Sequence, residues 1–498
     1  MNYILSFDIG TSGVKCGIFD ETLACLVITR RDYEVSMNPD GTVEADPEAY
    51  IRAMTDCSRE ALAVSCVPAA DVRALAITTQ GETLIPIDRA GNPLSRAIVW
   101  LDGRASAEAD TLRSAFPDRV FRAKTGLPSI DGYVPLAKLA WIKAHTPDIY
   151  AKTYKFLLLE DYAIFRLTGR TVSEKALLTS TGYFDLTTDD LWDEALEAVG
   201  ISRSMLPDVV DPGARIGALT PEAASLLGFT ENTIVYAGAM DQLSGAVGCG
   251  NIADGCIHET TGTAMIVGST MNLADSLASN PELTIYRHAE KDKYLLLSIG
   301  RTATTILKWF AEQFYANEPQ DDIYAHLSEV AAAGVPGAGG IVLLPYFEGT
   351  IGSDGAENLR GCFWNVGLHN TRGDFVRAIF EGVAYMLRDN LALMPQGKTP
   401  DRLISIGGAS ASDIWCRIKA AVTGLEIVTM AQEETTLFGC ACIAAVGCGL
   451  YPDLAAAVGR LEISRRYVPE EAGRLEYDAL YDRYLKMKAS LEKLASQV

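Results

Sequence analysis

The chain has few histidines and lacks the cysteine and histidine spacings that hold metal ions. Its five histidines are isolated along 498 residues, so we do not expect catalysis by a histidine base or a histidine-bound metal. The 11 cysteines are scattered through apolar segments, and Cys440 and Cys442 are the closest pair. This usage indicates buried, reduced thiols rather than disulfides or zinc sites. A carboxylate is therefore the expected base of any reaction that needs one.

The chain also lacks a signal peptide, a dense basic run and a long apolar segment. No uninterrupted apolar stretch reaches the roughly 18 to 20 residues that span a bilayer, and the first strand starts almost at once and carries Asp8. The formal net charge of −21 disfavours binding to nucleic acid. We therefore expect a cytoplasmic protein that binds neither membrane nor nucleic acid and recognises a small molecule through a local positive pocket.

The first hairpin of the chain is its most informative stretch. Ile4–Ile9 and Val14–Phe19 predict two buried strands, joined by a tight turn from Gly10 to Gly13. Glycine at both ends of this turn permits positive φ, so backbone N–H groups can point into one concavity that cradles phosphate oxygens. The neighbouring side chains suit such a cradle, with a carboxylate for a divalent cation: Thr11, Ser12, Lys15 and Asp8. An ordinary β-hairpin with a polar tip is the alternative.

A second hairpin of this kind lies in the other half of the chain. Gly255–Val267 predicts a strand, a turn at Gly262 and Thr263, and another strand. A chain of 498 residues is too long for one core. We therefore predict duplicated domains, 1–246 and 247–498, that face each other across a cleft and hinge near Gly245–Gly250. Two unrelated hairpins are the alternative.

The segments between the hairpins alternate between strand and helix patterns. Asp46 is followed by an amphipathic pattern that predicts an N-capped helix over 49–64. Apolar runs predict strands over 72–78 and 84–87, and helices over 136–145 and 152–167. Glu160 and Asp161 fall on the last of these helices, where we expect them to be solvent-exposed or to cap it.

Asp241 is the candidate base. Thr233–Gly238 predicts a strand that stops just before this aspartate, and a helix of small residues follows. A lone carboxylate at a strand end, in an apolar segment, suits deprotonation of an alcohol. It suits equally the N-cap of a helix that starts at Gln242. A later strand, Leu403–Ile406, runs into Gly407 and Gly408, which favours either contact with a planar ring or close packing of helix on sheet.

These segments, in this order, resemble the FGGY family of ATP-dependent carbohydrate kinases. Tyr133–Ile142 is similar to the first signature of the family, from which Ala144 departs. Gly361–Val366, followed by Asp374–Glu381, is similar to the second signature. There Asn365 replaces the usual glycine, and asparagine readily accepts a left-handed conformation. The resemblance extends along almost the whole chain.

The resemblance implies two actin/hexokinase-like (ribonuclease H-like) α/β domains that face each other across a nucleotide and sugar cleft. It implies ATP and Mg²⁺ as cofactors, Asp241 as the catalytic base, and Asp8 and Asp241 at the metal. The residues that it implies for the phosphates and the adenosine are Gly10, Thr11, Ser12, Lys15, Gly262, Thr263, Thr304, Gly408, Ala409 and Ser412.

The residues expected to bind the phosphoryl acceptor resemble those of two branches of the family. Trp100–Arg104 resembles the corresponding stretch of xylulokinases, whereas Gln80–Thr83 resembles that of glycerol kinases with an arginine replaced by Gly81. This glycine removes a cation and opens volume, which favours an acceptor larger than glycerol. We expect a pentulose such as D-xylulose, with glycerol or another polyol as the alternative. The implied substrate residues are Gln80, Gly81, Glu82, Trp100, Asp102, Arg104, Tyr133 and Gln242.

Two other classes of protein stay open. A non-catalytic sugar or nucleotide sensor would keep the hairpins and lose the base, but Asp241 is present. A heat-shock-type ATPase would share the nucleotide site and lack both Trp100–Arg104 and the two signatures. We also expect the domains to close on the substrate and the chain to form a homodimer, the commonest symmetric assembly.

Overall fold

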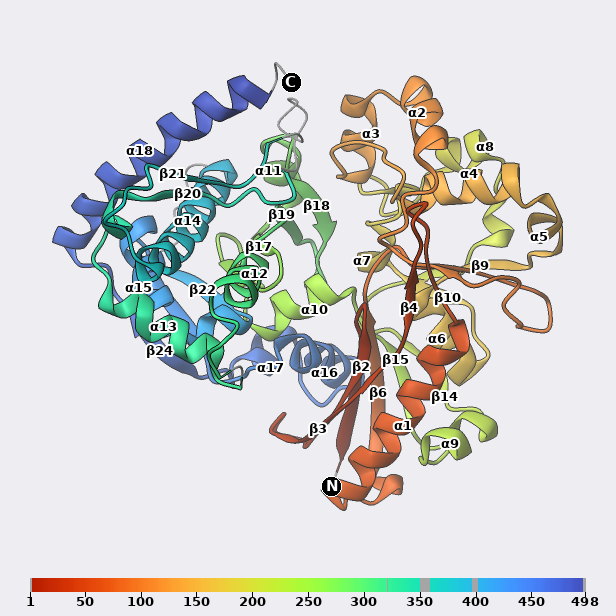
Figure 1. Cartoon of the computed structure of the whole chain (residues 1–498). Helices are drawn as coiled ribbons and strands as arrows, with labels where there is room; N and C mark the ends of the chain where they lie inside the picture. Colours follow the sequence, from red (N-terminus) through yellow and green to blue (C-terminus); the bar gives the residue numbers. More distant parts are fainter. Residues whose placement is uncertain (1, 320, 350–358, 396–401, 496–498) are drawn as a thin grey trace.

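The protein folds into two lobes that correspond to the two halves of the chain (Figure 1). The structure is a computed structural model that describes residues 2–319, 321–349, 359–395 and 402–495. Two helices lie where the lobes meet, α10 (Asp241–Gly248) and α16 (Thr435–Gly447). Within these described ranges, no helix is both long and apolar enough to cross a bilayer.

A six-stranded mixed sheet forms the centre of the N-terminal lobe. The first hairpin, β1 with β2, is antiparallel, and β1 pairs on its other side with β6 in parallel. The strands predicted at 4–9, 14–19, 72–78 and 233–238 are confirmed as members of this sheet. In order it contains β14 (Arg215–Ala218), β15 (Ile234–Ala237), β6 (Val72–Thr79), β1 (Tyr3–Ile9), β2 (Gly13–Phe19) and β3 (Cys25–Asp32).

The two faces of this sheet are covered by helices from different halves of the chain. Because side chains alternate along a strand, Leu5 and Phe7 of β1 share one core with the helix α1 (Pro47–Ser65). Ile4 points the other way and shares a core with Leu437 of α16. The predicted cap of α1 is confirmed, since the Asp46 carboxylate accepts a hydrogen bond from the Glu48 N–H. The C-terminal half therefore completes the N-terminal lobe.

The C-terminal lobe repeats the same topology. Its second hairpin, β16 with β17, is antiparallel, and β16 pairs with β22 in parallel, as β1 does with β6. One further edge strand, β18, extends the repeat. In order the sheet contains β18 (Thr284–Arg287), β19 (Tyr294–Gly300), β17 (Met265–Met271), β16 (Ile257–Thr261), β22 (Arg402–Ile406), β23 (Glu426–Met430) and β24 (Ile463–Tyr467). The expected duplication of the fold is confirmed.

Each lobe contains smaller elements besides its central sheet. The N-terminal lobe has a second sheet, in the order β4 (Val35–Met37), β5 (Val43–Ala45), β8 (Ala97–Ile98), β7 (Leu84–Ile87) and β9 (Lys155–Leu158). It also has two strand pairs, β10 (Val172–Glu174) with β13 (Asp208–Val210) and β11 (Phe184–Asp185) with β12 (Asp190–Leu191). Its remaining helices are α2 (Ser106–Ala115), α3 (Asp118–Thr125), α4 (Pro135–His145), α5 (Pro147–Lys152), α6 (Leu159–Thr168), α7 (Lys175–Leu178), α8 (Asp193–Val199) and α9 (Pro221–Leu227). The C-terminal lobe adds β20 (Val342–Leu344), β21 (Cys362–Trp364), α11 (Leu273–Leu277), α12 (Thr304–Phe314), α13 (Ile323–Ala333), α14 (Arg372–Leu393), α15 (Asp413–Thr423), α17 (Leu454–Val458) and α18 (Glu471–Ala495).

One predicted helix is wrong in its first half. Residues 155–158 form β9, which pairs antiparallel with β7, and α6 starts only at Leu159. A short apolar run fits a buried strand as well as a helix, so its periodicity does not separate the two. Glu160 and Asp161 are buried rather than solvent-exposed, although Asp161 does cap α6 by accepting from the Leu158 N–H. By contrast, the left-handed conformation predicted for Asn365 is confirmed, with a φ of 63°.

Facing glycines let α10 and α16 cross with their backbones in contact. A Cβ on Gly439 would lie 1.8 Å from the Ser244 carbonyl oxygen, and a Cβ on Gly248 would lie 1.7 Å from the Thr435 carbonyl oxygen. No side chain fits at either position without separating the helices.

We predict that Gly439→Ala destabilises the protein by at least about 3 kcal/mol, because the added methyl group overpacks a backbone contact that cannot relax. Gly245→Ala is the matched control, since its Cβ would meet only Thr436 Oγ1, at 3.6 Å. The control is expected to be neutral or to gain up to about 1 kcal/mol of helix propensity. Thermal unfolding of both variants measures the difference, and equal melting temperatures would contradict the crossing.

Candidate active site

The first glycine turn is closed by hydrogen bonds within the N-terminal lobe. The Gly10 N–H donates to the Gly13 carbonyl oxygen at 3.0 Å, and the Tyr33 hydroxyl donates to the Gly10 carbonyl oxygen. Positive φ is not the reason for these glycines, because neither is among the left-handed residues of the described chain. Gly13 lies close to the neighbouring strand instead, since a Cβ at this position would lie 2.7 Å from Asp32 Oδ1.

Lys15 and Asp8 lie side by side after this turn. Lys15 Nζ forms an ion pair of 2.6 Å with Glu434, which stands directly before α16 in the other half of the chain. Burial raises the pKa of Asp8 to about 6, and Glu434 contributes to the rise while Lys15 opposes it. The turn predicted to bind phosphate is thus tied across the lobe junction by a partly exposed ion pair.

Asp241 is the first residue of α10 and lies near Asp8. Burial raises its pKa to about 7, and the carboxylates of Asp8 and then Glu82 raise it further. The capping position of α10 belongs to Met240, which has no capping side chain. The alternative reading of Asp241 as an N-cap is therefore not supported. Two close carboxylates with raised pKa values are the electrostatic signature of a functional site.

Each of the three residues before Asp241 forms a hydrogen bond with another segment of the chain. The Gly238 N–H donates to Glu160 at 3.2 Å, and the Met240 N–H donates to Glu174 at 3.2 Å. Thr78 Oγ1 donates to the Ala239 carbonyl oxygen at 2.6 Å. These bonds orient the start of α10 and so the direction of the Asp241 side chain.

The predicted substrate turn follows β6 and lies against this segment. A Cβ on Gly81 would lie 2.8 Å from Met240 Sδ and 3.3 Å from Ser180 Oγ. The expectation that glycine opens volume here is therefore wrong, because Met240 fills the space. The side-chain amide of Gln80 is buried and lies within reach of the buried Tyr50 hydroxyl.

Glu82 and Trp100 connect the substrate turn to the first hairpin. Glu82 has a φ of 45°, and burial raises its pKa to about 7 against the opposing charge of Lys138. The Trp100 indole N–H donates to Thr11 Oγ1 at 3.0 Å. The buried ammonium of Lys138 donates to the carbonyl oxygens of Val99 at 3.0 Å and Trp100 at 3.3 Å, which fixes this stretch from below.

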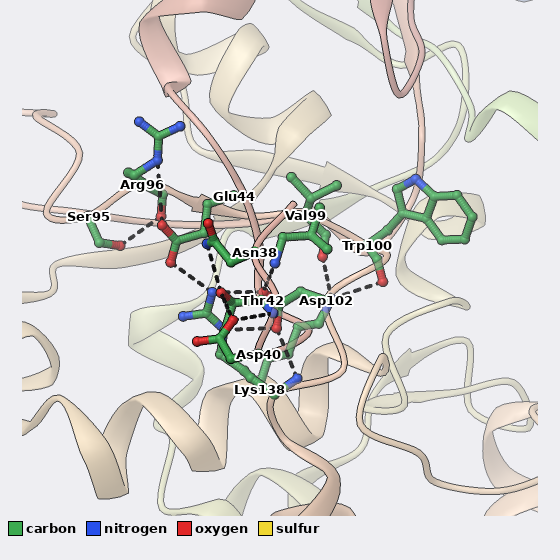
Figure 2. Close-up of polar contacts among 12 residues, drawn as sticks. Asn38, Asp40, Thr42, Glu44, Ser95, Arg96, Val99, Trp100, Asp102 and Lys138 are labelled. Atoms are coloured by element: carbon green, nitrogen blue, oxygen red, sulfur yellow. Dashed lines mark hydrogen bonds and ion pairs between the residues drawn. The ribbon is translucent and has the colours of Figure 1, made fainter. Parts of the chain in front are cut away.

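Asp102 and Arg104 form a closed cluster of hydrogen bonds, and Figure 2 shows the polar contacts around Asp102. Asp102 Oδ2 accepts from the Val43 N–H at 2.6 Å and from Arg104 Nη2 at 2.7 Å. Asp102 Oδ1 accepts from the Arg104 N–H and from Arg104 Nε. Arg104 also donates to Glu44 at 2.8 Å and stacks on Trp141. Each Asp102 oxygen thus has two protein donors, and the residue holds Arg104 rather than presenting its own carboxylate.

The other two predicted substrate residues are accessible. Tyr133 is half exposed, and its ring packs on Gly103. Gln242 is partly exposed beside Asp241 on α10.

The second glycine turn is held by the start of α12. Thr304 Oγ1 donates to the Gly262 carbonyl oxygen at 2.7 Å, and Thr305 Oγ1 does the same for Thr263. Thr304 therefore supports the turn directly. Its neighbour Ala303 donates through its N–H to the Thr263 carbonyl oxygen.

The glycine pair after β22 leaves an open face. Gly407 adopts a φ of +80°, and a Cβ on the exposed Gly408 would meet nothing within 4 Å. Ala409 is buried behind it, and Ser412 Oγ donates to Ser328 Oγ at 3.0 Å. Of the two readings of this pair, the geometry favours contact with a planar ring over tight packing at Gly408.

A buried ion pair joins these two turns from beneath. Lys419 Nζ lies 2.6 Å from Glu259 Oε1, and both side chains are fully buried. The ammonium also donates to Thr261 Oγ1 at 3.0 Å and to Ser405 Oγ at 3.4 Å. Thr261 precedes the Gly262 turn and Ser405 precedes the Gly407–Gly408 turn, so one cation sets their separation.

Sequence profiles of two domains match the chain. The N-terminal domain of the FGGY family of carbohydrate kinases matches residues 3–248, and the C-terminal domain matches residues 256–448. The chain belongs to the FGGY family of carbohydrate kinases. The kinase activity expected from the sequence, with ATP as the phosphoryl donor of the family, is thereby confirmed.

The similar proteins include kinases that are named for different acceptors. A xylulose kinase of Bacillus subtilis is 27% identical over 487 residues, covering 97% of this chain and 96% of the relative. A glycerol kinase of Polaromonas naphthalenivorans is 29% identical over 471 residues, covering 91% and 92%. Among solved structures, xylulose kinase from Rhodospirillum rubrum has a TM-score of 0.89 at 25% identity, covering 99% of this chain and 100% of the other. Ligand-bound xylulose kinase from Lactobacillus acidophilus has a TM-score of 0.89 at 22% identity, covering 99% and 98%.

Sequence reasoning missed the pair of Lys419 and Glu259. Glu259 follows Ile257 and His258 on a strand, and Lys419 lies between Ile418 and Ala420 on a helix. Opposite charges at such positions are rarely buried unless paired, and this is the signal that would have linked them.

We predict that Lys419→Met raises the KM for ATP at least about tenfold and leaves the KM for the sugar within twofold, because small displacements of positioning groups cost binding. Arg377→Met is the matched control. It breaks another buried ion pair of the same lobe, with Glu381 at 2.7 Å, and so costs similar stability.

Steady-state kinetics below both melting temperatures separate the two effects. If Arg377→Met raised the KM for ATP as much as Lys419→Met, the ion pair of Lys419 and Glu259 would have only a structural role.

Proposed function

We propose that this FGGY kinase transfers the γ-phosphoryl group of ATP to a terminal hydroxyl of a pentulose such as D-xylulose. The observation that carries this proposal is a pair of partly exposed carboxylates at the lobe junction, Asp8 and Asp241, both with raised pKa values. The xylulose kinases among its relatives and similar structures support the acceptor. Glycerol is the second candidate, favoured by the stretch Gln80–Thr83, which resembles that of glycerol kinases, and by the similarity to a glycerol kinase.

Asp241 acts as the general base. An alcohol is a weak nucleophile, and a carboxylate with a pKa of about 7 accepts its proton near neutral pH. Phosphoryl transfer otherwise needs positioning and neutralisation of oxygen charge. The fixed segment from Gly238 to Met240 supplies that positioning.

Asp8 and Asp241 are also the proposed ligands of Mg²⁺. Two hard oxygen donors that raise each other's pKa suit a cation that keeps several waters and binds one or two carboxylates plus substrate phosphates. The described residues include no cluster of three or more acidic, cysteine or histidine ligands, which fits this mode. The bound cation would neutralise phosphate charge.

The glycine turns take the nucleotide in this proposal. The first turn, with its hydroxyls and Lys15, lines one side of the phosphates, and Gly262 and Thr263 line the other. Thr304 acts through the Gly262 turn that it holds. The open face at Gly408, with Ala409 and Ser412 beside it, borders the adenosine.

The acceptor contacts proposed here include Gln80. Its amide is buried with the Tyr50 hydroxyl beside it, and a buried amide that has further donors and acceptors to satisfy favours a polar ligand. Asp102 is a positioning residue for Arg104. We also propose domains 1–246 and 247–498, with the hinge at the glycines of α10.

We predict that Asp241→Asn lowers kcat by about 10² to 10⁴, because the group that accepts the proton of the sugar hydroxyl is removed. Asp193→Asn is the matched control, since Asp193 also begins a helix, α8, but lies on the surface. Its kcat is expected to match the wild type. Turnover of Asp241→Asn within threefold of the wild type would refute the assigned base.

The pH dependence follows from the same group. Asp241 must be deprotonated, so kcat/KM for the sugar is expected to fall as the pH decreases through about 7 and to level off above it, with bound cation moving the midpoint lower. A profile of kcat/KM from pH 5 to 9 measures this.

We predict that a panel of ketoses and polyols, scored by kcat/KM, ranks a pentulose at least about tenfold above glycerol, because a site with unmatched polar groups penalises a smaller acceptor. Glycerol in first place would select the alternative. ADP release that no acceptor stimulates would overturn the sugar kinase assignment.

A further inference from the structure

An edge strand of the C-terminal lobe docks onto the N-terminal lobe beside the candidate active site. β18 pairs with β19 on one side only, and Figure 1 shows it between the two lobes. On its other side the Ile285 N–H donates to the Gly126 carbonyl oxygen at 2.9 Å. The Arg287 N–H points the same way, toward Thr179 Oγ1 at 3.4 Å.

Side-chain contacts fix this docking. Arg287 Nε forms an ion pair of 2.6 Å with Asp189. Arg122 of α3 donates to the carbonyl oxygens of Pro281 at 3.0 Å and Asn280 at 2.9 Å, just before the strand. A Cβ on Gly126 would lie 2.5 Å from the Ile285 carbonyl oxygen, so the two backbones touch.

This docking turns Tyr286 toward the acceptor side of the site. Alternation along the strand places its side chain opposite those of Ile285 and Arg287, which are buried. Tyr286 remains partly exposed. The strand lies beside the substrate turn, because the Arg287 N–H contacts Thr179 and a Cβ on Gly81 would lie 3.3 Å from Oγ of the next residue, Ser180. Burial raises the pKa of the Tyr286 phenol, and the charges of Glu82 and Asp241 raise it further.

The donors around this phenol are already used. Glu82 and Asp241 accept hydrogen bonds when ionised and donate none, and Ser180 bonds to Glu82 while Gln242 bonds to Asp241. The cations nearby are already used, Lys138 on backbone carbonyl oxygens and Arg104 on Asp102 and Glu44. Among the described residues, none forms a hydrogen bond with the Tyr286 hydroxyl. A sugar hydroxyl that donates to a carboxylate still needs a donor for its own lone pair.

We propose that Tyr286 completes the acceptor site from the C-terminal lobe, its hydroxyl donating to a sugar hydroxyl and its ring covering the sugar. The proposal rests on the proposed function and deepens it. Tyr286 is then a specificity-determining residue that binds the acceptor without moving its proton. Because Asp241 and Glu82 come from the other side of the junction, a bound sugar bridges both lobes.

The test uses the full-length protein with Tyr286→Phe and Tyr286→Ala. Tyr286→Phe is expected to weaken sugar binding by about 5- to 30-fold, the range for one lost hydrogen bond with a partner left unpaired. Tyr286→Ala should weaken it more, because the covering ring is lost as well. The KM for ATP and kcat at saturating sugar should stay within about threefold.

The matched control is Tyr294→Phe on the neighbouring strand β19, a buried tyrosine of the same sheet. It should leave sugar binding unchanged. Calorimetric titration of the preferred sugar from the panel measures affinity without turnover, and melting temperatures show that each variant is folded.

The outcomes separate this inference from the function on which it rests. Wild-type binding that Tyr286→Phe and Tyr286→Ala both preserve would overturn the role of Tyr286 and leave the kinase assignment intact. Absence of sugar binding and of sugar-stimulated turnover in the wild type would overturn both.

Discussion

The crossing of α10 and α16 through facing glycines is the contact on which the rest of this structure depends. Asp241 begins α10 and Glu434 stands directly before α16, so the approach of these helices sets both charges. Glu434 then pairs with Lys15 beside the first glycine turn. Because α16 also covers one face of the N-terminal sheet, the crossing places the carboxylate of one segment against the turn of another far away in the chain.

Two buried carboxyl groups also fix the start of α10, where Asp241 lies. Glu160 and Glu174 grip the two N–H groups just before Asp241. Burial raises the pKa of Glu174 to about 8 and that of Glu160 well above its ordinary value. A protonated carboxyl group still accepts hydrogen bonds and avoids the desolvation of a charge, so these residues hold a backbone segment at low electrostatic cost.

In the C-terminal lobe, a buried ion pair between Lys419 and Glu259 fixes two of the glycine turns. Lys419 has three donors and Glu259, Thr261 and Ser405 provide three acceptors. A fully satisfied network rigidifies the elements that it joins, here the two turns assigned to phosphate and adenosine. The two lobes thus stabilise their turns differently, with carboxyl groups on backbone N–H groups in one lobe and a buried cation between strands in the other.

Much of the fold and of the site could be predicted from local patterns. The two buried strand patterns, Ile4–Ile9 and Val14–Phe19, and the glycine turn between them predicted the first hairpin, and a similar pattern in the second half predicted the duplication. The left-handed Asn365 followed from the chemistry of its side chain. These features depend on backbone and neighbour effects within a few residues, which the sequence contains in full.

The remaining features depended on contacts between distant segments. The apolar run at 155–158 became a strand because β7 offered it a partner, and Gly81 proved to be covered by Met240. Whether Asp102 holds Arg104, or Tyr286 reaches the acceptor side, depends on which elements pack together. The sequence by itself determined the kinds of side chain and the elements that carry them, and only the tertiary structure decided which of them meet, because burial and pairing are properties of the packed chain.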